Sequence, residues 1–181
     1  FVNDGNPIKE TDPFEARDPY SVSRIQSVYA ARYFRQLGLK TYVGYFFNHD
    51  SPRRSERHMA QKIATAARKA GVGQQQQIEV GDMSVVKEWT YAGDVVKGIW
   101  LLVNQDEIHE ANIASGIGYS IEEWARICFA EYGLDYSKYV KPVAGFKSEY
   151  RSLVANNKLI TSLGFSPEVD IVQLAKMMTH G

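Results

Sequence analysis

The chain has 181 residues, 44% hydrophobic and 23% charged, a composition that is ordinary for a globular protein with one core. Its 21 Lys and Arg residues balance its 21 Asp and Glu residues, and this zero net charge argues against a broad nucleic-acid-binding surface, which needs a basic excess. The single cysteine, Cys128, excludes an intramolecular disulfide and a clustered cysteine zinc site.

Targeting signals are missing from the sequence. No apolar run approaches the roughly 20 residues that span a bilayer, and Phe1–Thr11 lacks the basic start and apolar stretch of a signal peptide. We therefore expect a cytoplasmic protein with no membrane and no nucleic-acid partner. The chain begins without methionine, which suggests part of a longer protein.

Residues 1–17 are polar and contain two prolines, so they are expected to form a loop. A helix should follow, because Asp18 can cap its free amide groups and Pro19 suits its first position. Gly38 is expected to end this helix. Its apolar face would carry Val22, Ile25, Tyr29 and Tyr33.

Thr41–Phe47 is an almost uninterrupted apolar and aromatic run, typical of a strand buried on both faces of a parallel sheet. After a loop, Met59, Ile63 and Ala67 mark one face of a second helix. The alternation of strands and helices predicts an α/β protein. The further predicted elements are strands at Ile78–Val80, Val85–Trp89 and Ala111–Ser115, and helices at Ala92–Val103, after the capping box of Ser120 and Glu123, at Asn157–Gly164 and at Pro167–Met178.

Several reactive residue types are better explained by structure than by chemistry. Cys128 lies among apolar helical positions, where a buried and unreactive thiol is expected. The three tryptophans, Trp89, Trp100 and Trp124, are expected to pack in the core. The histidines, His49, His58, His109 and His180, are scattered without metal-ligand spacing, and we predict no metal site.

Tyr20 and Arg24 stand four residues apart at the start of the first predicted helix, and therefore on one face. A tyrosine hydroxyl has an ordinary pKa of roughly 10, so a nearby cation is needed to make it a useful base near neutral pH. Taken alone, this spacing is more often a surface contact than a catalytic pair.

Two segments resemble a known family. Pro13–Ser23 resembles the segment around the catalytic tyrosine of extended short-chain dehydrogenases, and Phe46–Arg54 closely resembles a segment of the GDP-mannose 4,6-dehydratase family within that group. The resemblance extends from Phe14 to Met178. The group carries lysine where this chain has Arg24, and arginine keeps the charge without the compact shape of an ammonium.

The resemblance implies roles for individual residues. Tyr20 and Arg24 would be catalytic. The expected cofactor is NADP, with NAD as the alternative, and its binding residues would be Tyr20, Arg24, His49 and Arg54, the last in a loop that reaches a neighbouring subunit. The expected partner is a GDP-linked sugar, with Asn48, Lys62, Lys87 and Arg151 as its binding residues. Arg151 is our choice over Lys147 and Glu149 for the nucleotide.

The fold implied by the resemblance is α/β: the C-terminal part of a Rossmann-type fold, as in extended short-chain dehydrogenases, plus a small substrate-binding region. Residues 1–181 would form a single C-terminal portion of an NAD(P)-binding epimerase/dehydratase domain. No glycine-rich turn follows an early strand, so the N-terminal fingerprint half is missing from this chain.

The implied reaction converts GDP-mannose to GDP-4-keto-6-deoxymannose, in an intact protein that is a homodimer or homotetramer. Tyr20 would remove a hydroxyl proton while hydride passes from C4 to the cofactor, water leaves across C5 and C6, and hydride returns at C6. The assisting serine or threonine and glutamate would precede Phe1, so the isolated chain should be inactive. Two alternatives stay open: a sugar-nucleotide epimerase or 4-reductase, and a non-catalytic nucleotide-sugar-binding subunit, suggested by Arg24.

Overall fold

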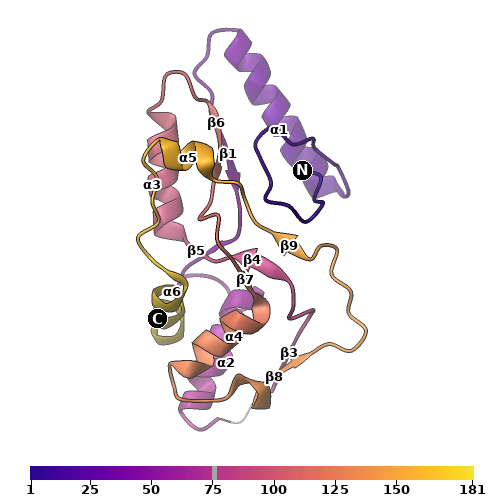
Figure 1. Ribbon diagram of the computed structural model, residues 1–181, viewed down its shortest axis with the longest axis vertical. Coiled ribbons are helices and arrows are strands. Elements are labelled where there is room, and N and C mark those ends of the chain that lie inside the picture. The colour runs from indigo at the N-terminus through magenta and orange to yellow at the C-terminus, as the bar shows by residue number, and fades with distance from the viewer. Residues whose placement is uncertain (75–76) are drawn as a thin grey trace.

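The structure is a computed structural model that describes residues 1–74 and 77–181. Figure 1 shows two parts: one contains α1, α3 and α5 with strands β1 and β6, and the other contains α2, α4 and α6 with a group of short strands. The chain passes repeatedly between the parts, so each is built from segments that are distant in sequence. The predicted α/β class is confirmed.

The first part is built on a two-stranded parallel sheet, in which β1 (Val43–Phe46) pairs with β6 (Glu110–Ile113). The helices α3 (Ala92–Val103) and α5 (Lys158–Ser162) pack against β6. The bounds of α3 agree with those predicted. The buried apolar core of this part consists of Val95, Leu102, Ala111, Ile113, Ile160 and Phe165.

Helix α1 (Pro19–Gln36) starts where the sequence predicts. The Asp18 carboxylate accepts a 2.6 Å hydrogen bond from the amide of Ser21, and Pro19 occupies the first turn, where no amide hydrogen is required. The expected loop before the helix is also present, apart from an isolated bridge between Ile8 and Ala155.

The predicted apolar face of α1 was wrong. Tyr29 and Tyr33 are each 57% exposed, and Val28 is the residue of this helix that is buried. The helix is attached to the sheet mainly through ion pairs of Arg32 and Arg35 with Glu110, so its position does not require the tyrosines to be covered.

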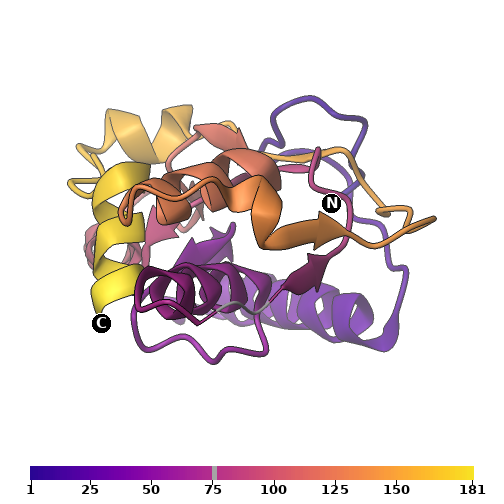
Figure 2. The ribbon, with the colours of Figure 1, turned by 90° about the horizontal axis from the view of Figure 1, so that it is seen from below.

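The second part has a core of three helices, α2 (Met59–Gly71), α4 (Ile121–Ala130) and α6 (Ile171–His180), which pack against one another. Figure 2 shows the three helices gathered on one side of the molecule. Within this core Trp89 and Trp124 stack, with ring centroids 4.6 Å apart. The predicted capping box at the start of α4 is confirmed.

The strands of the second part are short. β4 (Val86–Glu88) lies between β7 (Gly118–Ser120), which is antiparallel to it, and β9 (Ser152–Leu153), which is parallel. β3 (Ile78–Val80) pairs instead with β8 (Val140–Pro142), which follows a single 3-10 turn at Tyr136–Lys138. Between the two parts, β2 (His49–Asp50) pairs with β5 (Thr90–Tyr91).

Some predicted boundaries were wrong for physical reasons. Phe46, expected to be buried, is 52% exposed because β1 has only β6 beside it among the described strands. The strand predicted to reach Ser115 ends at Ile113, since the Ser115 amide binds a carboxylate. Trp100 is 71% exposed on α3 and does not pack in the core.

The last helix begins later than predicted, at Ile171. The amides of Glu168 and Val169, which an earlier start would place in the helix, donate to the buried carboxylate of Asp94. Asp170 then caps the helix, accepting a 2.8 Å hydrogen bond from the amide of Gln173.

Candidate functional site

Tyr20 lies in the first turn of α1 and is 69% exposed. The guanidinium carbon of Arg24 lies 5.1 Å from the centroid of its ring, the range of a cation–π contact. The two side chains therefore share one face of the helix, as the spacing predicts, and a ligand can reach them from solvent.

The start of α1 and the segment after β1 lie at the same end of the first part. Thr41 donates a 2.7 Å hydrogen bond to the carbonyl of Ala31, which fixes the other end. From that point the helix runs back roughly 16 Å to Tyr20 at 1.5 Å per residue, and the strand segment runs roughly 23 Å to Asn48 at about 3.3 Å per residue. Both residues therefore lie toward the end of the first part that is away from the Thr41–Ala31 contact.

Asp50 is a buried carboxylate that the sequence analysis did not identify. One of its oxygens lies 3.4 Å from Nε of Arg54, and Nη2 of Arg54 lies 3.1 Å from Nδ1 of His58. Burial raises the pKa of Asp50, and the neighbouring Arg54 guanidinium opposes this shift. The structure thus pairs one predicted site residue, Arg54, with a buried carboxylate, and another, His49, directly precedes that carboxylate on β2.

His49 and Asn48 are positioned by main-chain contacts. The His49 ring nitrogen Nδ1 lies 2.9 Å from the carbonyl oxygen of Phe47. The carbonyl of Asn48 accepts a 3.3 Å hydrogen bond from the amide of Thr90, across the β2–β5 pair. His49 is therefore carried on a short strand, and Asn48 directly precedes that strand.

Lys87 and Arg151 come together through the pairing of β4 with β9. The amide of Val86 donates a 2.9 Å hydrogen bond to the carbonyl of Arg151. The Lys87 ammonium lies 5.6 Å from the ring centroid of Tyr150. These two predicted substrate-binding residues, far apart in sequence, therefore lie on neighbouring chain segments.

Lys62 lies on α2, and its ammonium donates a 2.6 Å hydrogen bond to the carbonyl of Glu79. The residue lines a pocket of about 480 Å³ together with Gln77, Ile78, Glu79 and Lys141. Among the described residues, no other predicted site residue lines this pocket.

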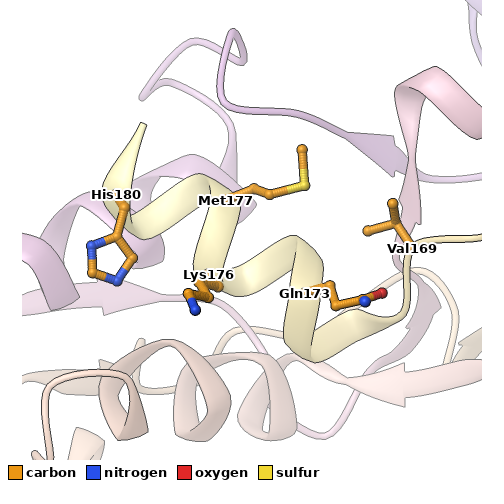
Figure 3. Close-up of a pocket in the computed structure, with 5 residues that line it drawn as sticks. All are labelled: Val169, Gln173, Lys176, Met177 and His180. Atoms are coloured by element: carbon orange, nitrogen blue, oxygen red, sulfur yellow. The ribbon is translucent and has the colours of Figure 1, made fainter.

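A second pocket, of about 460 Å³, runs along α6 and is mostly apolar (Figure 3). Its lining does not include any of the predicted site residues, so the shape of the surface alone would not locate them. The residues that line it are Val169, Gln173, Lys176, Met177 and His180.

Glu88 is the other buried acidic residue that the sequence analysis missed. It is fully buried, and its carboxylate accepts hydrogen bonds from the Ser115 amide and hydroxyl and from the amides of Gly116 and Ala155. Burial raises the pKa of Glu88, while these hydrogen bonds oppose that change. A glutamate on a predicted strand in which Lys87 is the only other charged residue was the available signal.

Other reactive groups have structural explanations. Cys128 is fully buried, and burial raises the pKa of its thiol, as expected of an unreactive cysteine. Within residues 1–74 and 77–181, no group of three or more His, Cys, Asp and Glu side chains is arranged to hold a metal ion. No helix in this part of the chain is both long and apolar enough to cross a membrane.

Solved structures establish the class. RMD from Pseudomonas aeruginosa, complexed with NADPH, superposes with a TM-score of 0.88 at 21% identity, over 99% of this chain and 61% of that protein. The UDP-glucose 4-epimerase of Thermus thermophilus, complexed with NAD, gives 0.82 at 20% identity, over 99% and 58%. The fold is therefore the C-terminal part of the Rossmann-type α/β fold of these two proteins.

Sequence comparison defines the family within that class. The profile of the family described as GDP-mannose 4,6 dehydratase matches residues 3–178. GDP-mannose 4,6 dehydratase 2 of Arabidopsis thaliana is 32% identical over 176 residues, which cover 95% of this chain and 47% of the relative. The chain belongs to the GDP-mannose 4,6-dehydratase family. It spans about half the length of the curated relatives it matches.

Proposed function

We propose that the protein containing this chain is a nucleotide-sugar 4,6-dehydratase that converts GDP-mannose to GDP-4-keto-6-deoxymannose. The observation that carries the proposal is the family match over residues 3–178. The neighbouring segments of Lys87 and Arg151 support it, because two basic side chains on adjacent segments suit an anionic nucleotide sugar. Residues 1–181 would form one C-terminal portion of an NAD(P)-binding epimerase/dehydratase domain.

The proposed cofactor is NADP, with NAD as the alternative; the two structural neighbours carry NADPH and NAD respectively. The exposed hydroxyl of Tyr20 and the adjacent guanidinium of Arg24 fit a ribose hydroxyl, because both can reach a ligand without moving a covering segment. When bound, the nicotinamide would supply the hydride acceptor and donor that the reaction needs.

The residues of this chain would orient the substrate and move its protons. Tyr20 would accept the proton of the C4 hydroxyl, and the Arg24 guanidinium lies beside its ring. Asn48, Lys62, Lys87 and Arg151 would hold the nucleotide, with the basic residues directed to the diphosphate.

His49 and Arg54 would lie near the cofactor. Arg54 contacts Asp50 and His58 of its own chain. Its predicted reach into a neighbouring subunit therefore requires exchanging these contacts for others, and a homodimer or homotetramer remains part of the proposal.

The test incubates full-length protein with GDP-mannose and NADP and identifies the product by NMR. We expect the 4-keto-6-deoxy sugar nucleotide. Equal turnover of UDP-glucose and dTDP-glucose would remove the GDP-mannose assignment. A product with a C4 alcohol or an inverted hexose would instead identify a 4-reductase or an epimerase. The isolated 181-residue chain should show no turnover.

Arg24, in place of the lysine of the family, is the observation that favours a non-catalytic nucleotide-sugar-binding subunit as the second candidate. The matched variants are Arg24→Lys and, as a control on an exposed arginine, Arg57→Lys. Activity in the unaltered protein supports the dehydratase. Activity in Arg24→Lys alone would favour the non-catalytic subunit.

A further inference from the structure

The Glu88 carboxylate joins three chain segments that are distant in sequence. One oxygen accepts hydrogen bonds from the Ser115 amide at 2.7 Å, the Ser115 hydroxyl at 2.8 Å and the Gly116 amide at 3.1 Å. The other oxygen accepts a 2.7 Å bond from the amide of Ala155. A single side chain on β4 thus holds both the exit of β6 and the exit of β9.

These contacts lie at the junction between the two parts of the fold. β6 belongs to the parallel sheet of the first part, whereas β4 and β9 belong to the three-stranded sheet of the second. The N-terminal segment joins at the same place, since Ile8 forms a bridge with Ala155. Movement of Glu88 would therefore alter how the second part sits against the first.

The proposed nucleotide residues lie next to this junction. Lys87 precedes Glu88 on β4, and successive side chains of a strand point to opposite faces, so burial of Glu88 turns Lys87 away from the junction. Arg151 leads into β9, the strand that ends at the Ala155 contact, and its carbonyl binds the amide of Val86.

The junction requires a carboxylate in particular. Buried amides need acceptors, and a donor left without one costs about 1–3 kcal/mol. Both oxygens of Glu88 serve donors. Glutamine has one oxygen, and its amide group would bring a donor against another donor.

We propose that Glu88 is a positioning residue that holds Lys87 and Arg151 in place for the diphosphate of the nucleotide. This inference rests on the proposed function, because it concerns the substrate side of the same site. It predicts that nucleoside diphosphate binding depends on Glu88 more strongly than cofactor binding does.

The test measures dissociation constants for GDP and for NADPH separately, by calorimetry on full-length protein and on Glu88→Gln. We expect the GDP constant to rise about tenfold or more, as small displacements of positioned groups commonly cause, and the NADPH constant to change by less than about twofold. Glu88→Asp keeps the charge and should give an intermediate GDP constant, so it tests the proposal if Glu88→Gln does not fold.

Glu110→Gln is the matched control. Glu110 also accepts hydrogen bonds from several donors, but near the start of β6, away from the junction. Glu110→Gln should lower the free energy of unfolding and leave the dissociation constant for GDP within about twofold of its unaltered value. Equal weakening of GDP binding in Glu110→Gln, or unchanged GDP binding in Glu88→Gln, would overturn the positioning role and leave the proposed function standing.

The GDP-mannose assignment is contradicted by a different result from the one that contradicts the positioning role. If the protein binds UDP or dTDP in preference to GDP, the GDP-mannose assignment is lost, while weakening of that nucleotide by Glu88→Gln still supports the positioning role. If none of the three diphosphates binds, both the proposed function and the positioning role of Glu88 are contradicted.

Discussion

Arg32 donates hydrogen bonds to the Glu110 carboxylate from two nitrogens, Nε at 2.9 Å and Nη2 at 2.7 Å. Arg35 adds a third contact at 2.9 Å, and the hydroxyl of Tyr45 donates at 2.8 Å. This cluster fastens α1, the helix that carries Tyr20, to the parallel sheet. The position of the proposed catalytic tyrosine therefore depends on an ion pair at the opposite end of its helix.

Glu110→Gln should lower the free energy of unfolding by about 2 kcal/mol at neutral pH, as loss of hydrogen bonds to a charged group commonly does. Burial would raise the pKa of Glu110, but hydrogen bonds from Arg32, Tyr45 and Arg35 lower it to about 2. Because the folded-state pKa lies below the unfolded value of about 4.3, the ionised group stabilises the fold above that value.

The difference in free energy of unfolding between the unaltered protein and Glu110→Gln should therefore be constant above about pH 5. It should shrink as the pH falls from about 4.3 towards 2. Urea unfolding followed by circular dichroism at several pH values measures it. A difference that stays constant down to pH 3 would contradict the assigned ion pair.

Gly116→Ala should destabilise the junction. Gly116 has a φ of +73°, and a Cβ there would lie 2.7 Å from Cγ of Asn157, whose amide donates to the carbonyl of Ser115. We expect a loss of about 2–3 kcal/mol, from an unfavourable backbone conformation and a clash.

Gly133→Ala is the matched control for this substitution, since Gly133 has a φ of +65° with nothing within 4 Å of the added Cβ. It should cost only about 1–2 kcal/mol, from the backbone alone. Equal melting temperatures for the two variants would show that the Asn157 side chain moves away from the added Cβ at no cost in free energy, which would contradict the predicted clash.

Lys87→Gln should raise the dissociation constant for GDP about tenfold, the size expected from losing one charge-assisted hydrogen bond to phosphate. Calorimetry at two ionic strengths is informative, because the weaker binding should also depend less on salt. Lys176→Gln, on α6 beside the apolar pocket, should leave both quantities unchanged. An unaltered salt dependence in Lys87→Gln would place the lysine outside the diphosphate site.

Tyr20→Phe should lower kcat for GDP-mannose at least about 100-fold, because it removes the proposed base. GDP binding should change by less than about twofold, since the hydroxyl is assigned to the sugar and cofactor. Tyr29→Phe, also exposed on α1, is the control and should retain activity. A kcat for Tyr20→Phe within a few-fold of the unaltered protein would remove the catalytic assignment.

Local signals predicted the helices well. The starts of α1 and α4 follow from neighbours along the chain, Asp18 with Pro19 and Ser120 with Glu123, and the structure agrees with both. The motif at Phe46–Arg54 likewise indicated the family, which the profile match confirms. Such signals are readable because capping and turn chemistry act over a few residues.

The short strands were harder to predict. In the strand pairing, Lys87 lies opposite Tyr119 on one side and Leu153 on the other. No local pattern in the sequence predicts a strand partner so distant along the chain. The exposed Tyr33 and Trp100 also escaped prediction, since an apolar side chain at helical spacing looks the same whether or not another element covers it.

The amino-acid sequence determined the family, the helices and the residue types that suit a nucleotide sugar, since these depend on short segments. Only the tertiary structure decided which of those residues meet: it placed Lys87 beside the segment of Arg151, placed Lys62 beside Gln77 and Lys141 in a pocket, and put Glu88 and Asp50 at buried positions. The physical reason is that a buried charge is stable only beside partners brought from distant segments, and folding alone supplies those partners.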